Sequence, residues 1–389
     1  MANTIDSQLQ LTEVLDSSMR AIKRKLMPLL QFSTVFQDVQ LKGDGTMAVP
    51  HYPLTATGSS STRAANGSRK ALASGTATEA RTIDNFTNKV QALSFTATER
   101  ARQPLLNPEM HGMLKGEALA YDILADIFGV VRASDFDSTT IAAVTAANFD
   151  EDDIGDLRQI CAEEFWPDSG RSLILNPAYG TNLLKQAQII DASMRGDGGR
   201  SFRDGVLGNV LGFDVVETAG LQANNGTAIS SITGVAATDV ITATAHGFAV
   251  GDRVLFPTLT GGSGLTAATV AYYVITVPSV NTFTVSATPG GAVLDFSSAI
   301  TDGSVRLFEN IQGVAILPSA LLIGFAPVPP TAAIRQKLFD YQELRDESGL
   351  VLQYYHFADE DTDEEVQTIE CHYGFATGDT DQLKIIRSL

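Results

Sequence analysis

Residues 55–82 form the feature that most restricts how this chain can fold. The stretch TATGSSSTRAANGSRKALASGTATEART contains no aromatic residue and consists mainly of Ser, Thr, Ala and Gly. It lies between two segments with strand character, TVFQDVQLKGDGTMAVPHYPL (34–54) and NFTNKVQALSFTATERA (85–101). A connection of this length is unusual inside one compact domain, where it generally has a function or is disordered. We therefore predict an extended β-hairpin that cannot bury its own faces and that another part of the structure must cover.

The composition is that of a globular protein without membrane-spanning segments. The 389 residues are 44% hydrophobic and 19% charged, enough for two or three domains with their own cores. No run of about 18 apolar residues occurs, and the polar N-terminus, MANTIDSQLQLTEVLDSSMR, lacks the apolar core of a signal peptide. Because Cys161 and Cys371 have no metal-ligand spacing, each is predicted to be a buried free thiol in a reducing cytosol.

The net charge of −18 is unevenly distributed along the chain. Residues 1–110 contain 12 basic and 9 acidic residues, whereas residues 111–389 contain 15 and 36. An acidic body argues against a dedicated DNA-wrapping protein, because binding to phosphates relies on basic groups that displace counterions. The mildly basic leading segment suggests that one part of the chain lies against an acidic part of a neighbour.

A first helix is predicted over residues 11–26, where apolar residues recur at helical spacing until Pro28 ends the pattern. Basic residues crowd its last turns, where cations suit the helix dipole. The ordinary interpretation is a solvated face, and the alternative is contact with nucleic acid or an acidic partner. The candidates for that contact are Arg20, Lys23, Arg24 and Lys25.

A long helix is predicted over residues 107–131, with His111 in a structural role. A further helix at 150–166 begins with an acidic turn that the helix dipole favours. Residues 171–187 indicate a short buried strand, an Asn-Pro break and another helix, and residues 205–218 indicate a turn and a strand. The apolar face of the long helix is predicted to consist of Met110, Met113, Leu114, Leu119, Ile123, Leu124, Ile127 and Phe128.

The chain changes character after Asn224. Residues 226–306 are rich in Thr, Val, Ala and Gly, and short alternating runs such as DVITATA, YYVITV and TFTVSAT indicate a small all-β module. The mixed character returns at ENIQGVAILPSALLIGFAPVPP (309–330), so we predict that the module is inserted into a parent domain. Residues 334–389 are predicted to form three or four antiparallel strands, which makes the whole chain an α+β fold.

The sequence contains none of the motifs GxxxxGK[ST], GxGxxG after a strand, HExxH or GxSxG. The glycine-rich stretch RGDGGRSFRDG (195–205) is predicted to be a mobile loop, with a phosphate cradle as the alternative. His246 and Asp252, in ATAHGFAVGDRVLF, resemble catalytic partners, but glycines between alternating residues predict the turn of a β-hairpin. Since no nucleophile in a strained turn accompanies them, no catalytic residue and no cofactor are predicted.

The acidic run DEDTDEEVQTIE (359–370) partly matches an EF-hand calcium loop. The sixth position, which needs a glycine for its sharp turn, is Glu364, and no helical pattern flanks the run. We therefore predict a solvated acidic turn without a metal, with an incidental divalent-cation site as the alternative. The first, third, fifth and twelfth positions of the loop hold Asp359, Asp361, Asp363 and Glu370.

The order of these segments resembles that of tailed-bacteriophage major capsid proteins with the Hong Kong 97-type fold. The likeness is carried by the helical arm, the polar hairpin and the long helix, followed by LILNPAYGTNLL, GVLGNVLGFDVVET and GVAILPSALLIGF. Residues 226–306 separately resemble small β modules that recur in phage structural proteins, through HGFAVGDRVLF, YYVITV and TFTVSAT. The first resemblance covers essentially the whole chain apart from this module.

The resemblance implies a division into the parts of such a capsid protein, with the β module at 226–306 on the outer surface. The parts are an N-terminal arm at 1–34, an extended loop at 35–100, a spine helix with part of a peripheral domain at 101–149, an axial domain at 150–225 and 307–330, and peripheral-domain strands at 331–389.

In such a shell a neighbouring subunit would cover the extended loop, and basic residues of the loop would face an acidic patch on that subunit. Each exposed pair contributes only ~0–1 kcal/mol. We therefore expect charge to set the register, while apolar burial over roughly 2,000–5,000 Å² holds the shell. The candidates for these contacts between subunits are Arg63, Arg69, Lys70 and Arg81 on the loop, and Asp359, Asp361, Asp363 and Glu364 in the patch.

The sequence departs from part of the family at one point. Some members join subunits through a lysine–asparagine bond in the late strands, but no asparagine follows Asn310 here. We therefore expect no such crosslink, and stability added instead by the β module or by separate decoration proteins. No long leading segment precedes the first helix, so a separate scaffolding protein is expected.

The resemblance implies a non-enzymatic coat protein that assembles in the host bacterial cytoplasm. Copies would form the hexamers and pentamers of an icosahedral virion capsid enclosing double-stranded DNA. The expected partners are other copies, scaffolding, portal and decoration proteins, and DNA held by weak non-specific contacts, with no membrane. Two alternatives stay open: an encapsulin-type nanocompartment shell, and a surface hydrolase or carbohydrate-binding protein with its site in the β module.

Overall fold

The computed structural model describes residues 7–31, 33–36, 46–51, 79–83, 86–96, 108–136, 141–186, 207–359 and 364–388. The chain divides into two compact units. Unit 1 comprises Met1–Asp126 and Pro318–Asp379, and unit 2 comprises Ile127–Leu317 and Thr380–Leu389. Within the described ranges, no helix is long and apolar enough to cross a membrane. Helices and strands occur in both units, so the chain is a mixed α+β protein, as predicted.

Unit 1 is built on a six-stranded sheet around the long strand β19 (Glu364–Thr377). One edge of β19 pairs with β18 and, further along, with β16, and the other edge pairs with β4. The sheet ends in β17, antiparallel to β18, and in β1, parallel to β16. The bounds are β1 Thr34–Phe36, β4 Thr87–Thr96, β16 Leu321–Phe325, β17 Asp340–Arg345 and β18 Val351–Asp359, with a short helix α9 at Ala332–Arg335.

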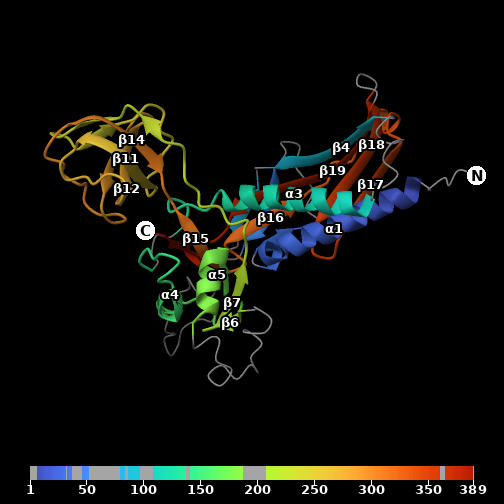
Figure 1. Cartoon of the computed structure of the whole chain (residues 1–389), viewed down its shortest axis with the longest axis horizontal. Coiled ribbons are helices and arrows are strands. Elements are labelled where there is room, and N and C mark those ends of the chain that lie inside the picture. Colours follow the sequence, from blue (N-terminus) through green and yellow to red (C-terminus); the bar gives the residue numbers. More distant parts are fainter. Residues whose placement is uncertain are drawn as a thin grey trace, which may run out of the picture. The chain divides into compact units, whose positions relative to one another are not determined.

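Two long helices, α1 (Ser7–Gln31) and α3 (Pro108–Phe128), lie side by side along this sheet (Figure 1). They approach closely because α3 presents glycines to a serine of α1. Ser18 Oγ donates to the Gly112 carbonyl at 2.9 Å, and a Cβ on Gly116 would lie 2.7 Å from the Ser18 carbonyl oxygen. A partly buried hydrogen bond joins α3 to the sheet, since the Tyr373 hydroxyl of β19 donates to Asp126 at 2.8 Å.

The first helix is longer than the sequence predicts. We expected Pro28 to end it, but α1 continues to Gln31. A proline removes one backbone N–H and crowds the carbonyl four residues earlier. Only three residues of α1 follow Pro28, so little of the helix depends on the missing hydrogen bond.

The extended loop differs from the predicted hairpin in its strand pairing. β2 (Met47–His51) pairs with β3 (Glu79–Ile83) as a separate two-stranded ribbon, with Met47 opposite Ile83. The segment expected to complete the hairpin, 85–101, contains β4, which pairs with β19 instead. That ladder runs along the whole of β4, and it places one face of β4 against α3, where Lys89 lies 2.8 Å from Asp126. Residues 52–78 lie outside the described residues.

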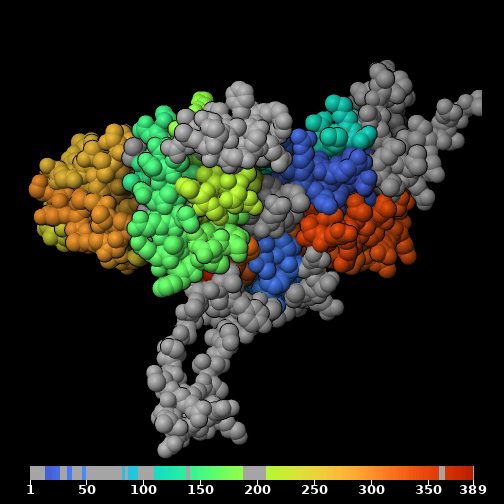
Figure 2. Space-filling view, turned by 90° about the horizontal axis from the view of Figure 1, so that it is seen from below, coloured from blue at the N-terminus to red at the C-terminus, as the bar shows by residue number. Residues whose placement is uncertain are grey.

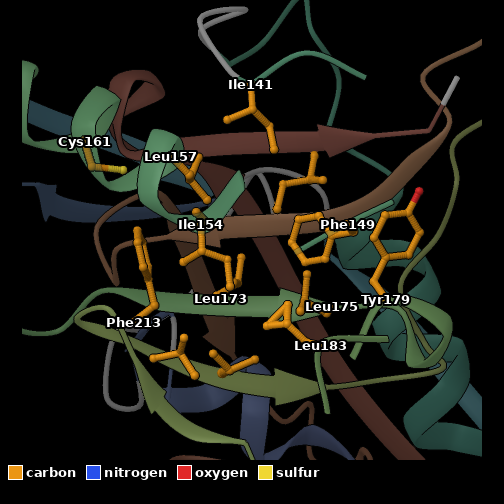
Figure 3. Close-up of a cluster of buried hydrophobic side chains, with 14 of the residues drawn as sticks. Ile141, Phe149, Ile154, Leu157, Cys161, Leu173, Leu175, Tyr179, Leu183 and Phe213 are labelled. Atoms are coloured by element: carbon orange, nitrogen blue, oxygen red, sulfur yellow. The ribbon is translucent and has the colours of Figure 1, made fainter. Parts of the chain in front are cut away.

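Unit 2 contains a five-stranded sheet in the order β20-β15-β5-β7-β6, with α4 and α5 packed on it through one buried apolar cluster (Figure 3). Asp150 forms a capping box at the start of α4, and Asn176 caps α5 with Pro177 in its first turn. These caps confirm the predicted helix starts. The bounds are α4 Glu151–Glu163, α5 Pro177–Leu184, β5 Ser172–Leu175, β6 Gly208–Val210, β7 Phe213–Glu217, β15 Ile311–Ile316 and β20 Leu383–Arg387, with a 3₁₀ turn at Thr380–Gln382.

The other strands of unit 2 form a seven-stranded sheet in the order β11-β12-β13-β10-β9-β14-β8. Because β11 also pairs with β14, the path of paired strands returns to its start around a separate core that includes Phe256, Tyr272 and Phe283. The bounds are β8 Ile229–Ser230, β9 Thr233–Val235, β10 Val240–Thr242, β11 Arg253–Gly261, β12 Ala271–Ser279, β13 Thr282–Ser286 and β14 Ile300–Leu307.

Candidate functional site

The basic residues of α1 lie beside acidic groups of unit 1. Lys23 Nζ is 2.6 Å from Asp346 Oδ1, in the turn that follows β17. The contact joins α1 to the C-terminal strands, which adjoin it in Figure 2 (blue and orange-red). Burial opposes ionisation of Asp346, but hydrogen bonds from Lys23 and Ser348 outweigh it and lower the pKa of Asp346 to about 2. The charge of Lys23 therefore fixes α1 to the sheet.

Arg20 and Lys25 also have acidic neighbours. Arg20 Nη2 lies 3.1 Å from Asp16, and Lys25 Nζ lies 4.0 Å from Glu117 of α3. Arg24 is exposed. Since three of the four cations proposed to contact nucleic acid lie beside a carboxylate of unit 1, the positive potential of this face is reduced. Contact between these residues and a genome stays a prediction.

The prediction of a solvated turn over the acidic run 359–370 is wrong for residues 364–370, which belong to β19 and pair with β18 and β4. Asp359 ends β18 opposite Glu364, which begins β19, so strands and not the helices of an EF-hand flank the turn. Arg81 lies on β3, opposite Val49. In the described part of the chain, no three His, Cys, Asp or Glu side chains gather where they could hold a metal ion. The other candidates for contacts between subunits lie outside the described residues: Arg63, Arg69, Lys70, Asp361 and Asp363.

The face of the unit 1 sheet that points away from α1 and α3, here the open face, is covered in part by the ribbon of β2 and β3, whose Met47 and Ile83 pack against β16 and β19. The same face carries a groove of ≈ 670 Å³. Tyr373 points toward α3, so Glu370 and His372, at odd spacing from it, point to the open face. Asn88 Nδ2 donates to Glu370 Oε2 at 2.9 Å across the floor of the groove. Pro329, Ile334 and Leu338 form part of its wall, with Tyr355 and Phe357 from β18.

Large apolar side chains are exposed on both faces of unit 1. Val328 and Phe339, in the segment beside the groove, are 51% and 67% exposed. On α3 the predicted apolar face is partly wrong, because Met110, Met113 and Leu114 are 60%, 42% and 55% exposed. The predicted apolar residues from Leu119 to Phe128 are buried, as expected. The apolar face predicted for α3 therefore includes residues that the rest of unit 1 leaves exposed.

His246 and Asp252 stabilise a turn. His246 Nδ1 accepts from the Phe248 N–H at 2.9 Å, and Asp252 Oδ2 accepts from the Ala249 N–H at 2.8 Å. The imidazole packs against the ring of Phe283, 5.1 Å between centroids. The predicted hairpin is wrong in its pairing, because β10 pairs with β9 and β13 whereas β11 pairs with β12 and β14. The turn therefore connects β10 and β11, which do not pair with each other.

Both cysteines are buried free thiols, which confirms the prediction. Burial raises the pKa of Cys161 to about 12, and burial likewise raises the pKa of Cys371 to about 12. Nucleophilic attack requires the thiolate. Neither thiol is therefore activated at neutral pH.

A buried charge cluster joins the seven-stranded sheet to the five-stranded sheet. Glu309 Oε1 accepts from the backbone N–H of Arg253 in β11 at 3.3 Å, and the Arg253 guanidinium donates to the backbone carbonyl of Glu309 at 3.4 Å. Glu309 Oε2 lies 3.1 Å from Arg387 Nη2 of β20. All three residues are more than nine-tenths buried. Burial, and next the charge of Arg387, lower the pKa of Arg253. Sequence reasoning missed this cluster because its members are far apart along the chain, and the one available signal was a charged residue at the start of an apolar strand pattern.

Comparisons with known proteins give matches to solved structures, while no family model and no curated protein matches. The capsid structure of cyanophage P-SCSP1u is 12% identical over 92% of this chain and 86% of that chain, with a TM-score of 0.47. The mature capsid of bacteriophage PhiM1 is 11% identical over 92% and 86%, with a TM-score of 0.45. A virus-like particle from Pyrococcus furiosus is 9% identical over 96% and 97%, with a TM-score of 0.41.

Proposed function

We propose that this chain is the major capsid protein of a tailed double-stranded DNA bacteriophage, a non-enzymatic subunit of an icosahedral shell built from hexamers and pentamers. The observation that carries the proposal is the order of elements. A long N-terminal helix, a two-stranded ribbon, a second long helix and two sheets follow one another as the resemblance implies, with the seven-stranded sheet between β7 and β15.

The surface of unit 1 supports an assembling subunit. Its sheet is covered by α1 and α3 on one face, while the open face, which the β2–β3 ribbon covers only in part, carries the groove and the exposed Val328. Contiguous exposed apolar surface marks sites of protein–protein contact. Copies of the chain placed side by side would bury this surface, and apolar burial is the main source of free energy in such association.

The elements suggest the following assignment of parts. We assign α1 to the N-terminal arm, the ribbon of β2 and β3 to the extended loop, and α3 to the spine helix. The sheet of unit 1 would be the peripheral domain, and the five-stranded sheet with α4 and α5 the axial domain. The seven-stranded sheet would be an inserted module on the outer surface, held by Glu309 between Arg253 and Arg387.

The partners follow from this assignment. Arg81 and the basic residues of the extended loop would face the acidic turn of a neighbouring copy, around Asp359 and Glu364. Scaffolding, portal and decoration proteins would contribute to a virion assembled in the host cytoplasm. The acidic charge of the whole chain, −18, would keep contacts with the packaged DNA weak.

The mass of the assembled protein tests the proposal. We expect the purified chain to form particles of megadalton mass by light scattering, and particles from the source cells to enclose double-stranded DNA. A monodisperse small oligomer would contradict the shell and favour the surface hydrolase or carbohydrate-binding protein. Particles that enclose a protein cargo without DNA would instead identify an encapsulin-type nanocompartment.

A further inference from the structure

The end of α4 holds Phe165 in a strained and exposed position. The Phe165 N–H donates to the Ala162 carbonyl at 3.1 Å, and the Trp166 N–H donates to the Cys161 carbonyl at 2.9 Å. These two bonds form a Schellman motif, in which the position of Phe165 is usually glycine because the backbone is left-handed. The φ of Phe165 is 60°, where a Cβ is unfavourable. Trp166 is buried, whereas Phe165 is 82% exposed.

The turn between β6 and β7 repeats this combination. Val210 pairs with Phe213, so Leu211 and Gly212 form a two-residue loop with φ values of 48° and 92°. Two positive φ values define a type I′ turn, in which Asn-Gly is the favoured pair. Leucine occupies the asparagine position here and is 43% exposed.

Phe165 and Leu211 stand out among the non-glycine residues with positive φ in the described ranges. Short polar side chains tolerate this backbone, and alanine exposes little apolar area. A large apolar side chain combines the strain with exposed apolar surface. The other residues of this kind are Asn224, Ser231, Asp239, Ala245, Ala268 and Asn310.

Both residues lie at the same end of the five-stranded sheet. β5 and β7 run parallel with Ser172 opposite Asp214. The Leu211–Gly212 turn directly precedes β7, whereas the segment 166–171 separates Phe165 from β5. Arg171 holds the segment after Phe165 at this end. Its side chain donates to the carbonyls of Trp166 and Pro167, each at 2.7 Å, and its own carbonyl accepts from the Asp214 N–H at 2.9 Å.

We propose that Phe165 and Leu211 form an apolar contact with a second copy of this chain. Strain at an exposed residue lowers the stability of the isolated subunit, so its benefit arises outside that subunit. Two such side chains bury only roughly 200–400 Å², far less than the ~1,200–2,000 Å² of a stable pairwise interface. This edge would therefore be one part of a larger interface, and in a ring of identical copies every subunit would repeat its contribution. This contact rests on the proposed shell function and assigns two residues to it.

Replacing each residue by the type that its backbone conformation favours should change subunit stability and assembly in opposite directions. We expect Phe165→Gly and Leu211→Asn to raise the melting temperature of unassembled subunits by about 1–3 °C, because both relieve strain. The same variants should raise the protein concentration needed for assembly at least about tenfold, because each removes apolar contact area. Phe165→Leu is the control, since it keeps an apolar side chain on the same backbone and should assemble within about twofold of the wild type.

Differential scanning fluorimetry of dilute protein and light scattering against concentration give the two readouts. Variants that melt higher yet assemble at the wild-type concentration overturn the contact and leave the shell function standing. A Phe165→Gly variant that melts lower shows that Phe165 acts within its own subunit, which also overturns the contact. A wild-type chain that stays monomeric at every concentration overturns the shell function itself.

Discussion

At the scale of single residues, we expect a buried ion pair to contribute more to the stability of the fold than an exposed one. The buried Glu309 carboxylate pairs with the guanidinium of Arg387 and accepts from the backbone N–H of Arg253, so it connects strands of both sheets of unit 2. The exposed pair of Arg345 and Glu343 is shorter, at 2.6 Å, yet water screens it. The distance between the charged atoms therefore does not rank the contributions of these pairs to stability. Leaving a buried charge without its partner costs much more free energy than leaving an exposed charge without one.

We predict that Glu309→Gln destabilises unit 2 by about 3 kcal/mol, since the amide keeps the shape of the side chain but leaves the buried guanidinium of Arg387 without its anion. Urea unfolding followed by the fluorescence of Trp166 measures the effect. The matched control, Glu343→Gln, should change the free energy of unfolding by ~0–1 kcal/mol. Equal effects of the two substitutions would contradict the importance of burial.

At the scale of elements, unit 1 depends on how closely its two long helices approach. Gly116 of α3 lies where a Cβ would meet the Ser18 carbonyl oxygen at 2.7 Å and the Ser18 Cα at 2.9 Å. Both are backbone atoms of α1, which no change of rotamer can move aside. Close contact between α1 and α3 therefore requires glycine at this position.

Gly116→Ala should destabilise unit 1 by about 1–3 kcal/mol, because the strain of overpacking exceeds the gain in helix propensity. The chain supplies a matched control in Gly155 of α4, where a Cβ would meet no atom within 4 Å. There the same substitution should stabilise the protein by up to about 1 kcal/mol. Thermal unfolding of the two variants gives shifts of opposite sign if the helix contact is correct, and shifts of the same sign if it is wrong.

Elements set by local chemistry could be predicted from the sequence, and elements set by distant partners could not. The starts of α4 and α5 follow from Asp150 and Asn176, whose side chains act within one turn. The pairing of β4 with β19 does not, because the alternating pattern of 85–101 fits any strand that buries one face. Periodicity likewise identified the apolar stripe of α3 but not that its first part, around Met113, is exposed.

At the scale of the whole molecule, charge and apolar surface have separate roles in the proposed shell. The groove and the exposed apolar residues of unit 1 supply apolar surface that another copy can bury. The free energy gained by burying it depends little on the orientation of the two surfaces. The net charge of −18 makes copies repel one another, so the few basic residues of the leading segment determine which surfaces can meet. Assembly is then expected to depend on salt in a way that apolar burial alone does not produce.

Reversing the loop charges with Arg69→Glu and Lys70→Glu should impair particle formation at low salt, because the loop would then repel the acidic turn of its neighbour. Each pair is worth only ~0–1 kcal/mol, but every subunit repeats the loss. Since salt screens like charges as it screens opposite ones, about 0.5–1 M NaCl should restore much of the yield of the variant. Adding Asp361→Lys and Glu364→Lys in the same chain should restore assembly at low salt, whereas Glu343→Lys, on β17, should not. Particle yield by sedimentation across a salt series measures all four chains, and a reversed loop that assembles like the wild type at low salt would show that these charges do not meet.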